Sequence, residues 1–192
     1  MFVLTIDQIG SRKGGDEVPA LLDALNEYDM VREFERTAGD EVQGVTDEAS
    51  VVRWISLKLL RDGGWHIGIG VGDAELGSSA RAGTGPAYLH AREAVDRTKS
   101  LNRFSPSIAV GGDGEDVTAA ESVLRAVGFI FANRTDAQWE AIDAHRGGAT
   151  VKEIAASLGV SVEAVSQRRG HGGQVVEESL WPTIDLLLGR SA

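Results

Sequence analysis

Two aspartates, Asp7 and Asp40, are the side chains whose type and placement best suit chemistry. Asp7 follows an apolar run at residues 2–6, and Asp40 belongs to a Gly-Asp turn between two short runs that alternate polar and apolar residues. Carboxylates held at one point repel each other and typically bind a hard divalent cation. The pair therefore predicts a Mg²⁺ or Mn²⁺ site that could hold the phosphates of a nucleotide. The alternative is that one aspartate caps a turn while the other lies in solvent.

The elements around these aspartates predict a sheet that would make them neighbours. The patterns indicate β-α-β-β-α-β, with strands over 2–6, 32–37, 42–45 and 65–72 and helices over 16–28 and 47–62. This order is typical of an α+β ferredoxin-like, palm-type sheet. There the third strand lies antiparallel between the first and second, so the end of the first strand meets the turn between the second and third. Asp7 and Asp40 should meet at that edge, with Glu41 close by.

The segment after these elements completes an α/β domain over residues 1–133. Alternate glycines in the run 65–72 predict that another backbone or a helix packs closely against that strand. A Gly/Ser-rich loop over 73–85 contains Arg81 and ends at Gly85, before a proline that suits the first turn of a helix. Arg81 and the backbone at Gly85 could bind a phosphate there, or the loop could simply be mobile. A helix over 87–100, a strand over 106–110 and a helix over 117–132 follow.

Residues 134–192 predict a second, small all-α domain of the helix-turn-helix type. Helices are expected over 136–145, 151–158, 162–169 and 175–189, the last one interrupted or restarted at Pro182. The second begins with a capping box at Thr150 and Glu153, and Gly159 makes the tight turn into the third. Helix, short glycine turn, helix is the pattern of a DNA reader.

The third of these helices carries the residues expected to contact DNA: Ser161, Gln167, Arg168 and Arg169. Gln can read adenine, Arg can read guanine or hold phosphate, and Ser can hold phosphate. The alternative is a solvated helix face. An apolar stripe on the last helix, comprising Val176, Leu180, Ile184, Leu187 and Leu188, could be domain core. It could also be the seam of a homodimer that supplies a second half-site.

Charge and composition restrict the partners and the compartment. Residues 1–133 hold 13 Lys and Arg against 21 Asp and Glu, a net charge of −8, and residues 134–192 hold 6 against 8, a net of −2. A general nucleic-acid coat would need a basic surface, so any DNA contact must come from a local cluster in the second segment. The chain has no cysteine, no apolar run near the roughly 20 residues of a membrane span, and no leader-like start. We expect a cytoplasmic protein with no membrane partner.

Several short motifs make the chain resemble a known family. Asp-Gln-Ile-Gly-Ser-Arg at residues 7–12, Ala-Gly-Asp-Glu at 38–41, Gly-Pro-Ala-Tyr at 85–88 and Ala-Arg-Glu-Ala at 91–94 are similar to the SatD family. These bacterial proteins place a domain like that of class III nucleotidyl cyclases before a helix-turn-helix. The run at residues 151–161 is similar to the helix-turn-helix of sigma-factor region 4 and of LuxR-type regulators.

The resemblance implies roles for individual residues. Asp7 and Asp40 match the cyclase aspartates that bind the metal ions, and Arg92 falls where an arginine stabilises transition-state charge. Tyr88 stands where cyclases have an asparagine that orients the ribose, which departs from the catalytic pattern. The other interpretation of Arg92 is an ion pair with a neighbouring acid on its own helix.

Three functions follow as expectations. The first is a DNA-binding transcriptional regulator, acting as a homodimer, whose cyclase-like domain senses a nucleotide with Mg²⁺ or Mn²⁺ or serves in assembly. The second is a metal-dependent nucleotidyl cyclase or nucleotidyl or phosphoryl transferase that uses Asp7 and Asp40. The third is a protein in which the first domain is only a platform for protein contacts.

Overall fold

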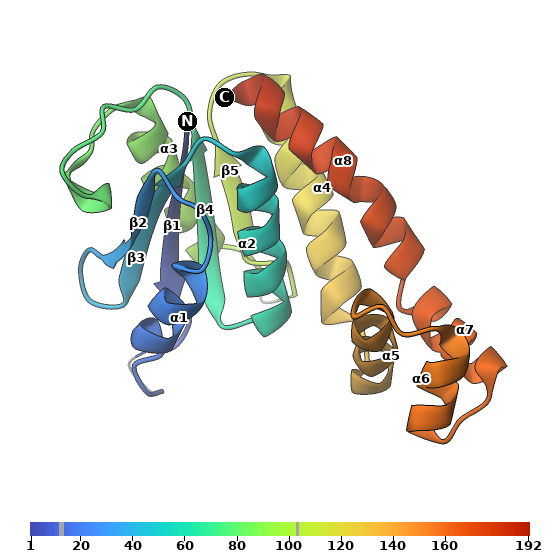
Figure 1. Cartoon of the computed structure of the whole chain (residues 1–192). Helices are drawn as coiled ribbons and strands as arrows, with labels where there is room; N and C mark the ends of the chain where they lie inside the picture. The colour runs from blue at the N-terminus through green and yellow to red at the C-terminus, as the bar shows by residue number, and fades with distance from the viewer. Residues whose placement is uncertain (12–13, 103) are drawn as a thin grey trace.

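The computed structural model describes residues 1–11, 14–102 and 104–192 and confirms the α+β class (Figure 1). Its centre is a five-stranded mixed sheet in the order β2-β3-β1-β4-β5. The strands are β1 (Phe2–Gln8), β2 (Arg32–Arg36), β3 (Glu41–Thr46), β4 (Trp65–Val71) and β5 (Ile108–Gly111). The helices around the sheet are α1 (Val18–Leu25), α2 (Ala49–Asp62), α3 (Pro86–Lys99) and α4 (Glu115–Ala132), with a short 3₁₀ turn, η1 (Ala80–Ala82). The motif predicted at residues 7–12 ends at Arg12, outside the described residues.

The strand pairing carries out the geometry expected for the aspartates. β1 is the middle strand and pairs antiparallel with β3 on one side and β4 on the other, while β5 runs parallel to β4. In this register Asp7 lies opposite Glu41 of β3 and opposite His66 of β4. The end of β1 therefore meets the turn that joins β2 to β3, and Asp40 lies in that turn.

The two faces of the sheet are covered by different helices. Phe2, Leu4 and Ile6 of β1 point into the main core, which α1, α2 and α4 complete. The alternate residue Val3 points to the opposite face, where α3 packs. Asp7 follows the same alternation and so lies on the α3 face.

The glycines of β4 allow α3 to approach that face closely. A Cβ atom on Gly68 would collide with the backbone of Ala91 and Val95, and one on Gly70 with the carbonyl of Ala87. The prediction of a close approach along this strand is therefore confirmed, and the packed element is a helix. This contact fixes α3, including its last residue Lys99, directly above the end of β1.

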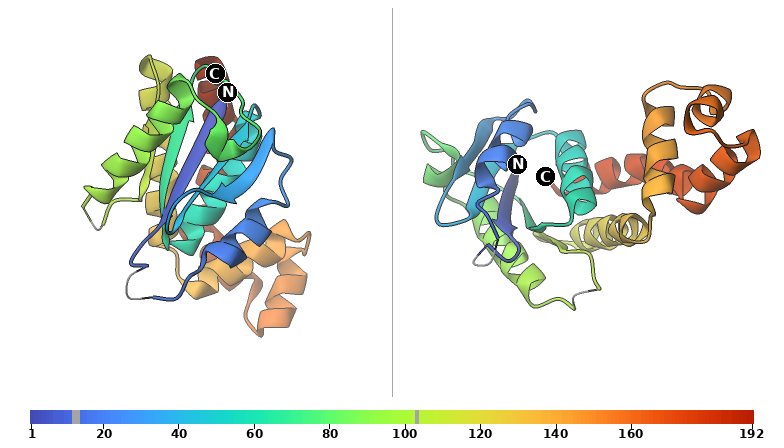
Figure 2. Two further views of the ribbon diagram at one scale, coloured as in Figure 1. Left: turned by 90° about the vertical axis from the view of Figure 1, so that its left-hand side faces the viewer. Right: turned by 90° about the horizontal axis from the view of Figure 1, so that it is seen from below.

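Three further helices form a separate three-helix unit: α5 (Asp136–Arg146), α6 (Val151–Leu158) and α7 (Val162–His171). Their own small core contains Ala141, Ile154, Ala155 and Val165. Thr150 and Glu153 form the predicted capping box at the start of α6, and Gly159 ends that helix at a φ of 64°, in the left-handed region. The unit projects away from the sheet at the far ends of α4 and α8 (Figure 2).

The last helix, α8 (Gln174–Ser191), returns from the three-helix unit to the sheet domain. Ile184 and Leu188 are fully buried in the main core, and Leu180 and Leu187 pack against it. The predicted stripe is therefore core, apart from Val176, which is exposed. The helix continues through Pro182 without the predicted interruption. A boundary at residues 133/134 stays a prediction, with the addition that the end of the second segment packs with the first.

Buried charges join the three-helix unit to α4 and α8. Arg134 and Glu177, each with a side chain only 1% exposed, form an ion pair of 2.7 Å, and Arg146 bonds the same Glu177 oxygen at 2.6 Å. Arg134 also donates to the carbonyl of Gly172 and lies over the Trp139 ring, 4.4 Å from its centroid. These contacts hold the start of α5, the end of α7 and the first turn of α8 together. None of the helices in the described ranges is both long and apolar enough to span a membrane.

Candidate functional site

The strand register brings the two predicted aspartates together where the end of β1 lies beside the turn between β2 and β3. Asp7 is the one partly exposed residue of β1, and Asp40 follows Gly39, whose φ of 60° makes the tight turn. Asp7 lies opposite Glu41 in the strand register, and Glu41 follows Asp40 in the chain, so the two aspartates are neighbours. A hydrogen bond with the Ser11 side chain is the main cause that lowers the pKa of Asp40, with contributions from its own backbone, Asp7 and Lys99.

A lysine already supplies a positive charge at this point. Lys99, the last residue of α3, lies 2.8 Å from Asp7 Oδ2 and 3.2 Å from Asp96 Oδ1. Burial opposes its charge, but the bonds to Asp7 and Asp96 outweigh it and raise the pKa of Lys99. The Asp7 side chain is 16% exposed and that of Lys99 38%, so the pair remains open to solvent. A ligand could therefore reach it without unfolding the domain.

A row of polar side chains crosses the sheet at the level of Asp7. Glu41, Asp7 and His66 lie opposite one another on three adjacent strands and so share the α3 face. His66 Nδ1 is 2.6 Å from the hydroxyl oxygen of Ser107, just before β5. Burial lowers the pKa of His66, and Lys99 acts in the same direction, against the opposite effect of Asp7 and Asp40. His66 is therefore a neutral group near pH 7 that can accept or donate a hydrogen bond.

Arg92, expected to act on a phosphate, binds a carboxylate instead. Both of its terminal nitrogens contact Glu41, with Nη2 2.9 Å from Oε1, and the Thr37 hydroxyl donates to the same carboxylate at 2.6 Å. The partner is on β3, so the other interpretation, a pair within its own helix, is not what the structure has. Arg92 lies on the same helix face as Lys99, seven residues earlier. Its catalytic role stays a prediction.

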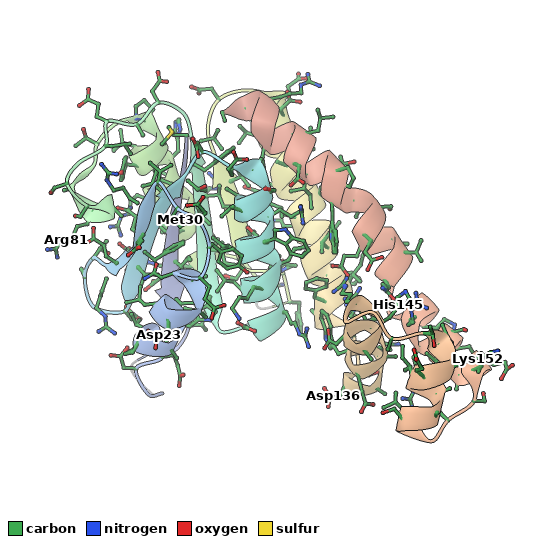
Figure 3. The ribbon with its side chains drawn as sticks, viewed as in Figure 1. Asp23, Met30, Arg81, Asp136, His145 and Lys152 are labelled. Atoms are coloured by element: carbon green, nitrogen blue, oxygen red, sulfur yellow. The ribbon has the colours of Figure 1, made fainter. Side chains whose placement is uncertain are left out.

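The predicted phosphate-binding residues lie elsewhere. Gly85 caps the N-terminal end of α3, whereas Lys99 is at the C-terminal end, and a helix of 14 residues is about 20 Å long. Arg81 projects outward from the loop at the edge of the sheet domain (Figure 3) and pairs weakly with Glu35 at 3.8 Å. The structure therefore does not bring Arg81 and Gly85 to the aspartates. A phosphate bound at Asp7 and Asp40 would have to use other groups.

The donor set decides what metal could bind. In the described parts of the chain no group of three or more His, Asp or Glu side chains is arranged to hold a metal ion. Two carboxylates alone fit Mg²⁺ when phosphate oxygens and water complete its shell, because Mg²⁺ is usually bound through one or two carboxylates plus substrate phosphates. Asp7 and Asp40 could thus hold a cation that arrives with a nucleotide, which stays a prediction.

The surface of α7 is the second candidate site. Ser161 caps α7, accepting a hydrogen bond from the backbone of Ala164 at 3.1 Å, and Gln167 is exposed on the next turns. Arg168 is partly exposed, with a contact of 3.7 Å to Glu140 of α5. Such a long, solvent-exposed pair contributes little and can be exchanged for another anion. Gln167 and Arg168 are therefore available to a ligand, while the Ser161 hydroxyl is engaged in capping the helix.

Arg169 has a different position from the other three predicted DNA-binding residues. Its Nε donates to the side chain of Gln174 at 2.7 Å, and Gln174 is buried at the start of α8. This bond helps to close the turn between α7 and α8. Arg169 is thus partly engaged in holding the three-helix unit together.

Two residues of the sheet-edge site were missed from the sequence. The sequence places Lys99 in a predicted helix and His66 in a predicted strand, with no further signal for either residue. The strand register supplies the missing signal for His66, since it is the residue that pairs with Asp7 across β4. For Lys99 the signal is the 14-residue length of α3, which carries its last turn back to the end of β1.

Comparison of the chain with protein-family models, with curated proteins and with solved structures gives no match. The assignment to a family and to a function therefore depends on the residues and their geometry.

Proposed function

We propose that this chain is a DNA-binding regulator with a ferredoxin-like, SatD-type domain that senses a nucleotide carrying Mg²⁺ or Mn²⁺. Its helix-turn-helix would be α6 and α7, with α7 as the recognition helix in the major groove. The observation that carries the proposal is the arrangement of the three-helix unit: a glycine turn, a capped α7, and Ser161, Gln167 and Arg168 on its open side. DNA readers that are weak as single units bind as dimers on paired half-sites, and we propose a homodimer here.

The electrostatics support a local and not a general DNA contact. The chain carries a net charge of −10, and the proposed helix has an acidic residue of its own, Glu163, and another, Glu140 of α5, beside it. Affinity would then come from a few base and phosphate contacts and would fall steeply as salt rises. Lys152 at the start of α6 also projects from this end of the molecule (Figure 3) and adds one positive charge.

The DNA proposal is tested with a pool of random double-stranded oligonucleotides at low salt. Wild-type protein should enrich a sequence subset, and Gln167→Ala plus Arg168→Ala should abolish the enrichment because both side chains lie on the open face. This variant spares Arg169, which supports the fold of the unit. Arg190→Ala, which removes an exposed arginine from the far end of α8, is the charge-matched control. Unselective binding, or equal enrichment by the double variant, would exclude α7 as the reader.

The nucleotide part of the proposal rests on the adjacent carboxylates of Asp7 and Asp40. A ligand that binds only the folded protein raises its thermal midpoint, so the midpoint is measured with nucleoside triphosphates, Mg²⁺, or both. We expect a rise with nucleotide and metal together in the wild type and none in Asp40→Asn. If neither nucleotides nor Mg²⁺ raise the thermal midpoint of the wild type, the domain would be a platform for protein contacts.

The same aspartate pair supports a second candidate, a nucleotidyl or phosphoryl transferase or cyclase. The bound cation would supply charge stabilisation at the phosphates, while Asp7 and Asp40 would hold it and Lys99 would contact a phosphate oxygen. This candidate predicts consumption of a nucleoside triphosphate that is lost in Asp40→Asn. Arg92, bound to Glu41, would first have to change partners in order to take part.

A further inference from the structure

A groove of about 660 Å³ opens directly beside the sheet-edge site. It lies between the C-terminal end of α3, the start of β4 and the last turns of α4. His66 and Lys99 line one end of it, so the groove and the aspartate site share a wall. Its volume exceeds that of a single ring, and Lys99, which lines it, bonds Asp7 at 2.8 Å.

Aromatic rings stand exposed on the groove. Phe104 is 73% exposed and Phe129 is 61% exposed, and both line the groove. The Phe129 ring, on the last turns of α4, offers an apolar surface on which a flat ring can stack. Gly128, next to Phe129, lets α4 pack against Pro106, since a Cβ there would come within 2.6 Å of the proline ring. This packing forms the floor of the groove.

Hydrogen-bonding side chains also line the groove. Asn102, Ser105, Ser107 and Asn133 line the groove together with the aromatic rings. His66, held at 2.6 Å from the Ser107 hydroxyl, presents a neutral ring at the end nearest the aspartates. An aromatic surface, amide and hydroxyl groups, and a lysine suit the base, the sugar and the phosphate of a nucleotide respectively.

We propose that this groove holds the nucleoside of the nucleotide, with the base stacked on Phe129 and the phosphates directed to Lys99 and the Asp7–Asp40 pair. The inference rests on the proposed function, because it assumes that the aspartates hold a cation with phosphates. It adds the place and chemistry of recognition for the part of the ligand that the aspartates cannot contact. It also places the ligand against the end of α4, next to Arg134, where the three-helix unit is attached.

The test measures binding of ATP labelled with a fluorescent methylanthraniloyl group on its ribose, with Mg²⁺, to the full-length chain. Every base has an aromatic face, so stacking accepts one purine as probe for others. Phe129→Ala should weaken binding by a factor of about 5 to 100, the usual range for losing a base–aromatic stack, and Phe129→Tyr should restore it. Leu89→Ala removes a similarly exposed apolar side chain that lies on α3, outside the groove. This variant should bind as the wild type does.

Competition separates the two ends of the ligand. Unlabelled adenosine should displace the probe from the wild type and much less well from Phe129→Ala, whereas inorganic tripolyphosphate should displace it equally well from both. Equal affinity of Phe129→Ala and wild type, or failure of the wild type to bind the probe, would overturn the groove assignment. Because Phe129 belongs to α4 and is not among the residues proposed to contact DNA, DNA enrichment by Phe129→Ala without nucleotide should match the wild type. A failure of the groove is thereby distinguished from a failure of the DNA proposal.

Discussion

Two clusters of charge in this molecule have opposite surroundings. At the junction, Glu177 is 1% exposed and is bonded by Arg134, Arg146 and the Trp181 ring nitrogen. At the sheet edge, Asp7 is partly exposed and shares a single lysine with Asp96. The buried cluster has no room to exchange a partner, while the open one can replace a weak internal cation with an external one. Burial thus separates charges that hold the fold from charges that can serve a ligand.

The comparison predicts the largest effect for the junction. Glu177→Gln keeps the shape of the side chain but leaves Arg134 and Arg146 without their shared anion, so the free energy of unfolding should fall by about 3–5 kcal/mol. Urea denaturation measures the loss. Glu178→Gln, a neighbouring and more exposed partner of Arg146, is the matched control and should cost less than about 1 kcal/mol. Equal losses would mean that burial is not what distinguishes the junction.

An intermediate effect is expected where a buried carboxylate depends on an exposed arginine. Glu41 is 6% exposed and Arg92 is 52% exposed, so Arg92→Met would leave the carboxylate with only the Thr37 hydroxyl. The free energy of unfolding should fall by about 1–3 kcal/mol, the usual cost of a buried polar group that loses a charged partner. Arg190→Met, which breaks an exposed pair with Asp116, should change it by less than about 1 kcal/mol. If Arg92→Met lowers the free energy of unfolding no more than this control does, the Glu41 carboxylate is hydrated and does not depend on Arg92.

At the open site the structural effect should be small and dependent on magnesium. Lys99→Met removes the cation from Asp7, so Mg²⁺ in the millimolar range should raise the thermal midpoint of the variant by more than it raises that of the wild type. A gain of about 1 kcal/mol corresponds to about 2–4 °C for a domain of this size. Lys58→Met, which breaks a helix pair with Asp62, is the control without a site. The same Mg²⁺ response in wild type and variant would show that Lys99 does not occupy the cation position.

The smallest effect is a pH dependence from His66. Burial lowers its pKa in the folded state below the usual 6.5, so the unfolded chain binds the proton more readily. The contribution of His66 to the free energy of unfolding is complete above about pH 6.5 and is lost as the pH falls through the folded-state pKa. The urea midpoint should therefore drop between pH 7.5 and 5, and less so in His66→Gln. An identical drop in the variant would assign the effect to other groups.

Local patterns were sufficient for most elements of the sheet domain. A strand was predicted from the apolar run before Asp7, a tight turn from the Gly-Asp pair, and a close approach of another element from the glycines of β4. The structure has each of these features at the predicted place. The meeting of Asp7 and Asp40 followed because the order of elements restricts how the strands can pair. The capping box at Thr150 and the turn at Gly159 were equally local and are present as expected.

Long-range contacts were beyond the sequence. Nothing near Arg92 in the chain indicates that it binds Glu41, 51 residues earlier, and nothing near Gly85 indicates that α3 points its other end at the aspartates. Pro182 suggested a break in α8, but the helix continues through it and its apolar residues lie in the core of the sheet domain. Such outcomes depend on which faces of distant helices pack, and a local pattern does not contain that.

The chain reaches the three-helix unit along α4 and leaves it along α8, and these two helices pack against each other and against α2. The three-helix unit is accordingly connected to the sheet by two packed helices and not by a flexible linker. Cutting the chain near residue 133 would remove Ile184 and Leu188 from the main core next to the sheet. Each of the two fragments would then be incomplete. A shift of α4 against α8 by a fraction of a helical turn would therefore change the position of the three-helix unit relative to the sheet.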